Sequence, residues 1–137
     1  MSDTIGNRFE TFGFGVPWED AAGYSQALRA GNTLFVSGQL SHDAEGNFLH
    51  VGDFEGQTQV TFENLDRVLG QFGAQRSDIV EVNVFVVNLR ENFDAATAAS
   101  KRYFEPHRPA SNILGVEALA FPDQLIEIAA TVALAGQ

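Results

Sequence analysis

Residues 79–87 read IVEVNVFVV, and this β-branched stretch decides the fold class. Polar Glu81 and Asn83 alternate with apolar residues in its first half, whereas its second half is apolar throughout. β-branched residues favour strands, and a continuous apolar run is typical of a strand covered on both sides. The pattern therefore predicts a central strand that is buried on both faces in its second half.

A helix is predicted on each side of this strand. Upstream, Phe62, Leu65, Leu69 and Phe72 recur at three- and four-residue spacing, so one face of a helix over residues 54–72 is apolar. Downstream, the Ala-rich residues 93–104 predict a second helix that ends before two prolines. Each helix has a face that can cover a sheet.

The remaining strands complete a mixed sheet. Residues 24–38, YSQALRAGNTLFVSG, contain two strand-like runs around a Gly-Asn turn, which predicts a β-hairpin. Residues 113–119 and 125–134 predict two closing strands. The fold class is therefore α+β, a mixed sheet with two helices on one face. With no third helix expected, the simplest cover for the second face is another copy of the chain.

The N-terminal stretch 8–19, RFETFGFGVPWE, places aromatic residues among two glycines and a proline. Glycine and proline interrupt regular structure, so we expect an arm that lies on the surface of the domain. Its aromatic rings either cover the edge of the core or, in the case of Trp18, form the wall of a pocket.

Composition limits the possible functions. A chain of 137 residues fits one domain, residues 1–137, with the N-terminal arm over residues 1–22. The net charge of -10 disfavours nucleic acid as a partner, because phosphate binding relies on clustered basic side chains. The absence of cysteine excludes thiol chemistry. The chain opens without a signal-peptide pattern and has no membrane-length apolar run, so we expect a cytoplasmic protein without a membrane partner.

Local motifs of the common enzyme classes are absent from the sequence. It contains no phosphate-binding glycine loop, nucleophile elbow or zinc-protease motif. His42, His50 and His107 fall in or near predicted loops and are far apart in the chain, so we expect no metal site.

Two single residues are candidates for a site. Gly38 closes a predicted strand, where it is either a turn residue or the floor of a pocket. Glu127 stands between Ile126 and Ile128 and points to the face opposite theirs. Its carboxylate lies either on a solvated face or in a cleft, where burial would raise its pKa toward acid–base use.

Five fragments stand in register across more than a hundred residues: GYSQ (23–26), VSGQ (36–39), VFV (84–86) with Leu89 and Phe93, RPA (108–110) and IEI (126–128). In this order and spacing the chain resembles the RidA/YjgF/UK114 family. The resemblance implies a chorismate-mutase-like α+β fold that forms a trimeric barrel, with three pockets at the subunit interfaces.

The resemblance also implies an activity. Family members with the full motif hydrolyse enamines and imines, such as 2-aminoacrylate, to a 2-keto acid and ammonia, and they need no cofactor. By position, Tyr24 would line the pocket, Gly38 would offer a backbone contact to the substrate, and Glu127 would hold the attacking water.

One residue departs from the family pattern. Ser111 stands where the family's Pro-x-Arg motif has an arginine that grips the substrate carboxylate. Its loss should weaken carboxylate binding by about 1.5 to 3 kcal/mol, roughly ten- to a hundredfold. Ser111 or Asn112 would then supply neutral hydrogen bonds, or Arg108 or Arg102 would substitute from a neighbouring position.

Three functions remain open at this point. The first is a hydrolase or deaminase for a small imine, enamine or related metabolite. The second is a non-catalytic trimer that binds a metabolite or a protein. The third is an endoribonuclease or translation inhibitor, which the acidic charge and the lack of paired catalytic histidines disfavour.

Overall fold

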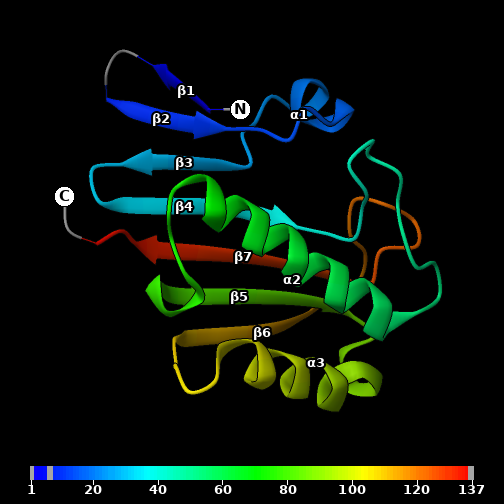
Figure 1. Ribbon diagram of the computed structural model, residues 1–137. Coiled ribbons are helices and arrows are strands. Elements are labelled where there is room, and N and C mark those ends of the chain that lie inside the picture. Colours follow the sequence, from blue (N-terminus) through cyan, green and yellow to red (C-terminus); the bar gives the residue numbers. More distant parts are fainter. Residues whose placement is uncertain (1, 6–7, 136–137) are drawn as a thin grey trace.

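The computed structural model describes residues 2–5 and 8–135, with side chains from residue 8 onward (Figure 1). One mixed sheet runs in the order β1-β2-β3-β4-β7-β5-β6, and all neighbours are antiparallel except the parallel pair β5-β6. The strands are β1 (Ser2–Ile5), β2 (Phe9–Phe12), β3 (Ala27–Ala30), β4 (Thr33–Gln39), β5 (Ile79–Val87), β6 (Ala110–Val116) and β7 (Ile126–Ala133). The helices are α1 (Pro17–Ala22), α2 (Phe54–Gln71) and α3 (Leu89–Phe104), with a 3-10 turn η1 (Arg76–Asp78).

The predicted α+β class and order of elements are confirmed. β3 and β4 form the predicted hairpin around Gly31, whose φ of 61° needs the left-handed conformation that glycine adopts readily. α2 lies within one residue of its predicted bounds. α3 begins four residues earlier than predicted, because Asn88 already turns the chain into the helix with a φ of 57°. β6 begins and ends three residues before the predicted strand.

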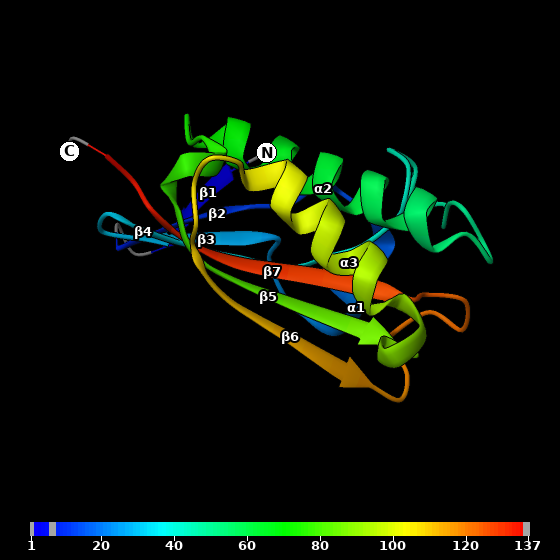
Figure 2. The ribbon, with the colours of Figure 1, turned by 90° about the horizontal axis from the view of Figure 1, so that it is seen from below.

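Both long helices lie on the same face of the sheet (Figure 2). Leu65 and Val68 of α2 belong to the same core cluster as Val84 of β5 and Ile128 of β7, and all four are almost completely buried. Asp53 caps the start of α2, because its side chain accepts a hydrogen bond of 3.0 Å from the backbone N–H of Gly56. The core therefore occupies the layer between the helices and the sheet.

The opposite face of the sheet carries partly exposed apolar side chains. Phe35 on β4 and Leu114 on β6 are 50% and 48% exposed, and Phe85 between them on β5 is half-buried. The expectation that β5 is buried on both faces in its second half is wrong for the single chain, because the long helices cover one face only. We call the face opposite α2 and α3 the open face.

The N-terminal arm is the main correction to the predicted structure. Residues 9–12 form β2, which pairs with both β1 and β3, and residues 17–22 form the short helix α1, a third helix that the pattern did not predict. Met1, Gly6 and Asn7, which belong to the predicted arm, lie outside the described residues. No helix in the described part of the chain combines the length and the apolar character needed to span a membrane.

Candidate functional site at the end of strands β4 and β7

One end of the sheet gathers α1, the loop after β4 and the loop before β7 (Figure 1). Glu127, the second residue of β7, lies here. Its neighbours Ile126 and Ile128 are buried under the helices, so the alternation of the strand turns Glu127 to the open face. The carboxylate is half-buried at this end of the sheet rather than fully solvated.

Gly38 lies directly against the Glu127 carboxylate. The register between β4 and β7 shifts between Val36 and Gln39, and Gly38 sits in this irregularity. A Cβ atom at position 38 would overlap both the Oε2 and the Cδ atoms of Glu127. Position 38 therefore requires glycine, because only a residue without a side chain lets the Glu127 carboxylate approach this closely. The carboxylate packs directly against the backbone of Gly38.

Tyr24 completes this group, which we call the Glu127 cluster (Tyr24, Gly38 and Glu127). Burial raises the pKa of the Tyr24 phenol, a hydrogen bond from Gln26 opposes the rise, and the charges of Glu19 and Glu127 add to it. Because the negative charge of Glu127 contributes to the raised pKa of Tyr24, the two side chains interact electrostatically. The phenol therefore stays protonated near neutral pH and can donate a hydrogen bond.

Gln124 holds the other side of the Glu127 carboxylate. Its Nε2 donates to Glu127 Oε1 at 3.3 Å and to the carbonyl of Ile126 at 3.2 Å, and the side chain is only 2% exposed. Burial raises the pKa of the Glu127 carboxyl above its usual value, and the hydrogen bond from Gln124 partly offsets this rise. Glu127 is thus an oriented carboxylate that takes up a proton more readily than an exposed one.

Behind the cluster runs a buried polar network that the sequence pattern did not reveal. The Glu19 carboxylate accepts hydrogen bonds from Gln26 Nε2 and from the backbone N–H groups of Phe14 and Gly15, at 2.8 to 3.1 Å. Gln26 Oε1 accepts in turn from Gln39 Nε2 at 2.9 Å. These contacts fix the chain before β3 and the end of β4, which carry Tyr24 and Gly38.

Trp18 of α1 lies at the same end of the sheet. Its ring meets those of His42 and Phe121 edge to face, at centroid distances of 5.1 and 5.2 Å. Its Nε1 is buried and makes no hydrogen bond within the described residues, yet it lies close enough to the Tyr24 hydroxyl to lower the pKa of that group. Trp18 therefore stands beside the Glu127 cluster.

The structure separates Ser111 and Asn112 from this cluster. Ser111 pairs with buried Val82 of β5 and faces the helices, whereas Asn112 faces the open side and donates to Asn83 Oδ1 at 2.9 Å. From strand spacing and rise, Ser111 and Glu127 lie roughly 14 Å apart between Cα atoms, on opposite faces. Within one chain, the five predicted site residues therefore do not form one pocket.

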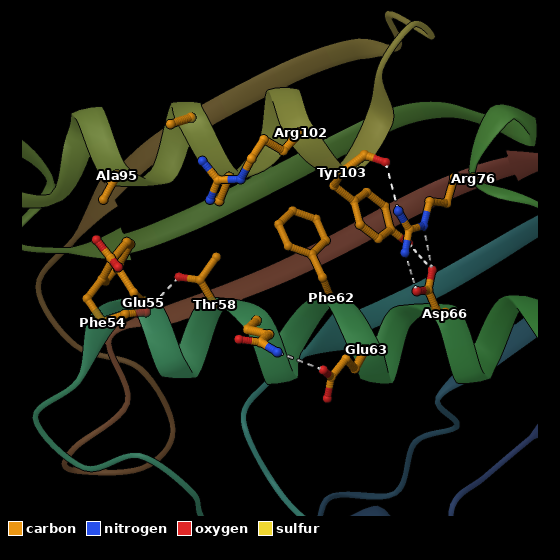
Figure 3. A pocket seen from close by; sticks show the side chains of 13 residues that line it. Phe54, Glu55, Thr58, Phe62, Glu63, Asp66, Arg76, Ala95, Arg102 and Tyr103 are labelled. Atoms are coloured by element: carbon orange, nitrogen blue, oxygen red, sulfur yellow. Dashed lines mark hydrogen bonds and ion pairs between the residues drawn. The ribbon is translucent and has the colours of Figure 1, made fainter.

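Arg102 lies apart from both the Glu127 cluster and Ser111, in the groove between α2 and α3 (Figure 3). This groove has a volume of about 540 Å³. Its end is closed by a fixed contact: Asp66 accepts hydrogen bonds from Tyr103 at 2.5 Å and from Arg76 at 2.8 Å. Of the two arginines that could replace the family's guanidinium, Arg108 lines the cavity of Ser111 and Arg102 does not.

The three histidines contact separate partners. His42 Nδ1 is 2.8 Å from the carbonyl of Asp43, His50 Nδ1 is 3.6 Å from Asp53 Oδ2, and His107 Nε2 is 2.7 Å from the carbonyl of Ile79. The described residues contain no group of three or more His, Cys, Asp or Glu side chains arranged to hold a metal ion.

The chain is similar to known sequences over most of its length. Residues 17–134 match the family model described as Endoribonuclease L-PSP. The chain is 35% identical over 96 residues to the 2-iminobutanoate/2-iminopropanoate deaminase of Dermatophagoides farinae, covering 70% of this chain and 74% of that protein. It is 33% identical over 108 residues to the 3-aminoacrylate deaminase RutC of Acinetobacter baylyi, covering 79% and 84%.

A solved structure shows the same fold. A member of the YjgF/YER057c/UK114 family from Mycobacterium tuberculosis superposes with a TM-score of 0.81 at 26% identity, covering 92% of this chain and 99% of that one. The chorismate-mutase-like fold expected from the sequence is therefore confirmed. With a family model that matches most of its length, this chain belongs to the YjgF/YER057c/UK114 (RidA) family.

Proposed function

We propose that this chain hydrolyses a small imine or enamine to a carbonyl compound and ammonia. The observation that carries the proposal is the half-buried, oriented carboxylate of Glu127, packed on the bare backbone of Gly38 and beside Tyr24. The deaminase names of two relatives support the reaction class.

The cluster supplies what this hydrolysis needs. Glu127 takes a proton from a water molecule as the water oxygen bonds to the imine carbon, and it passes this proton to the imine nitrogen to give a neutral carbinolamine. Glu127 then carries the carbinolamine hydroxyl proton to the amine nitrogen, the C–N bond breaks as the C=O bond forms, and ammonia leaves. A raised pKa suits the carboxylate to both transfers, and the protonated Tyr24 donates a hydrogen bond to the substrate. These steps consume water and release ammonia.

We place the complete site between two copies of the chain, in a homotrimer. A small substrate cannot touch Glu127 and Ser111 of the same protomer, because these two residues lie on opposite faces of the sheet. The open face supports the assembly, since Phe35 and Leu114 leave apolar surface in water that a neighbouring protomer would cover.

Phe35→Asp is expected to convert the trimer to monomers. A carboxylate at this half-exposed position costs the single chain little, but it would be buried without a partner in the interface. Light scattering coupled to size-exclusion chromatography measures the mass. Val51→Asp is the matched control, because Val51 is 63% exposed in the loop before α2, and this variant should remain trimeric. A trimeric Phe35→Asp protein would rule out this face as the interface.

Turnover separates an enzyme from a binding protein. Imines produced in situ by an amino-acid oxidase should be converted to 2-keto acids faster with the protein present, and a panel with and without carboxylates defines the substrate class. Thermal stabilisation by a panel compound without any turnover would instead support a non-catalytic metabolite-binding trimer.

A further inference from the structure

The hydroxyl oxygen of Tyr24 is approached by the N–H groups of two neighbouring side chains. Gln26 Nε2 donates a hydrogen bond to it at 3.4 Å. The indole Nε1 of Trp18 is buried, has no hydrogen-bond partner of ordinary length within residues 8–135, and lies close enough to lower the pKa of the Tyr24 phenol. An amide NH₂ group and an indole N–H can donate hydrogen bonds but cannot accept them. The phenol oxygen is therefore already faced by two donors.

Glu19 fixes the direction of the Gln26 amide. The Glu19 side chain is buried, and its carboxylate accepts hydrogen bonds from the backbone N–H groups of Phe14 and Gly15. Its Oε2 also accepts from Gln26 Nε2 at 2.8 Å. Since both carboxylate oxygens act as acceptors, the NH₂ group of Gln26 must face Glu19, and its carbonyl must face away. The second hydrogen of that NH₂ group then points to Tyr24.

The carbonyl end of the Gln26 amide is held as well. Gln26 Oε1 accepts from Gln39 Nε2 at 2.9 Å, and the same NH₂ group of Gln39 donates to the carbonyl of Ser37 at 3.1 Å. Gln39 is only 1% exposed, and its Oε1 has no hydrogen-bond partner in the described part of the chain. A buried carbonyl without a partner is unfavourable, but turning the Gln39 amide over would break both of its bonds. The protein thus keeps one fixed orientation of the amides even though it leaves a buried oxygen unsatisfied.

The hydrogen of the Tyr24 hydroxyl is left to point away from these donors. Among residues 8–135, the hydroxyl of Tyr24 has no acceptor within hydrogen-bond distance. Tyr24 belongs to the Glu127 cluster, and the negative charge of Glu127 contributes to its raised pKa. The O–H group is therefore available to donate to an atom of a ligand that binds at this cluster.

We propose that Gln26 and Trp18 are positioning residues, which make Tyr24 a hydrogen-bond donor to the ligand of the Glu127 cluster and prevent it from accepting. The identity of the ligand rests on the proposed function. The ligand atom that meets Tyr24 must carry a free lone pair, as an imine nitrogen or a carbonyl oxygen does and an ammonium nitrogen does not. The cluster is thereby suited to the neutral imine and to its carbonyl product, and not to a protonated amine.

A double-mutant cycle with Tyr24→Phe tests whether Gln26 and Trp18 act through Tyr24. Gln26→Met removes the N–H donors and roughly keeps the length of the side chain, so kcat for imine hydrolysis should fall roughly three- to tenfold, as expected for one neutral hydrogen bond. In the Tyr24→Phe background the same substitution should change kcat by less than about twofold, because no hydroxyl remains to be oriented. Trp18→Phe, which keeps an aromatic ring beside His42 and Phe121, should show the same pattern.

Gln57→Met is the matched control for these variants. Gln57 is an equally buried glutamine, but its amide bonds to His50, Asp123 and Leu125. Any effect of this substitution on kcat should be the same with and without Tyr24→Phe. If the effects of Gln26→Met and Trp18→Phe are also equally large in the two backgrounds, their role is structural only, and the inference is wrong.

The pKa of Tyr24 gives a readout that needs no turnover. The ultraviolet absorbance of tyrosinate follows it, and Tyr24 should titrate before Tyr103, because burial and the contact with Asp66 raise the pKa of Tyr103 far above its ordinary value. Loss of an N–H donor destabilises the phenolate, so Gln26→Met should raise the pKa of Tyr24 above that in the wild type.

An unchanged or lowered pKa of Tyr24 in Gln26→Met would overturn the inference. A raised pKa, together with a wild type that turns over no imine, would contradict the proposed function and support the role of Gln26 in setting the direction of the Tyr24 hydroxyl.

Discussion

Glu127→Gln is expected to lower kcat for imine hydrolysis by about 100-fold or more, because general base catalysis by a positioned side chain contributes on the order of 10² to 10⁴. The amide keeps the shape of the side chain and its contact with Gln124, but it cannot accept the proton of the attacking water. Steady-state kinetics on the best substrate of the panel measures the loss. If the variant keeps more than half of the wild-type kcat, Glu127 is not the general base.

The same substitution should stabilise the protein slightly. Burial raises the pKa of Glu127 in the folded state. Ionisation of Glu127 therefore lowers the stability of the folded protein at pH values above this raised pKa, and it has no effect at pH values below the ordinary pKa of 4.5. Because the group is partly exposed, the rise in Tm at pH 7.5 should be only about 1 to 2 °C. The advantage should disappear near pH 4, where both states are protonated. An equal rise in Tm at both pH values would show that ionisation of Glu127 is not its cause.

Gly38→Ala is expected to lower turnover by about 10- to 100-fold, because displacing a catalytic group by about 1 Å costs on the order of 10². The added methyl group would overlap the Glu127 carboxylate, which must rotate away from its contact with the backbone. The kinetic assay used for Glu127→Gln checks this result.

Gly70→Ala provides the matched control for this substitution. Gly70 lies in α2, and apart from its chain neighbours and the nearby helix backbone, a Cβ atom there would meet no atom within 4 Å. Its turnover should equal that of the wild type, and its helix should be slightly more stable. Wild-type turnover in Gly38→Ala would show that the close contact is not needed for activity.

Much of the fold could be predicted from local patterns. The 3.6-residue period around Leu65 indicates a helix, and the β-branched run of β5 indicates a strand, each within a single segment of sequence. Both elements were predicted to within a residue or two. β2 could not be predicted in this way. Its residues FETF become a strand because β3 offers an edge for pairing, and pairing between strands is not visible in a four-residue window.

The site was less predictable than the fold, because it depends on register and on buried amides. Gly38 and Glu127 stood out locally, as a strand-ending glycine and as a carboxylate between isoleucines. Gln124 and Gln26 gave no signal, since a glutamine that donates a hydrogen bond to Glu127 or to Glu19 looks like any surface glutamine in the sequence. That Ser111 and Glu127 lie on opposite faces follows only from the pairing of β5 with both β6 and β7.

The proposed hydrolysis of imines at Glu127 is tested most directly by the rate of ammonia release from 2-iminopropanoate, with the wild-type and Glu127→Gln proteins compared with buffer alone. Release should be well above buffer for the wild type and close to buffer for the variant. A wild-type rate equal to buffer with this and every other imine, or equal rates in the two proteins, would contradict it.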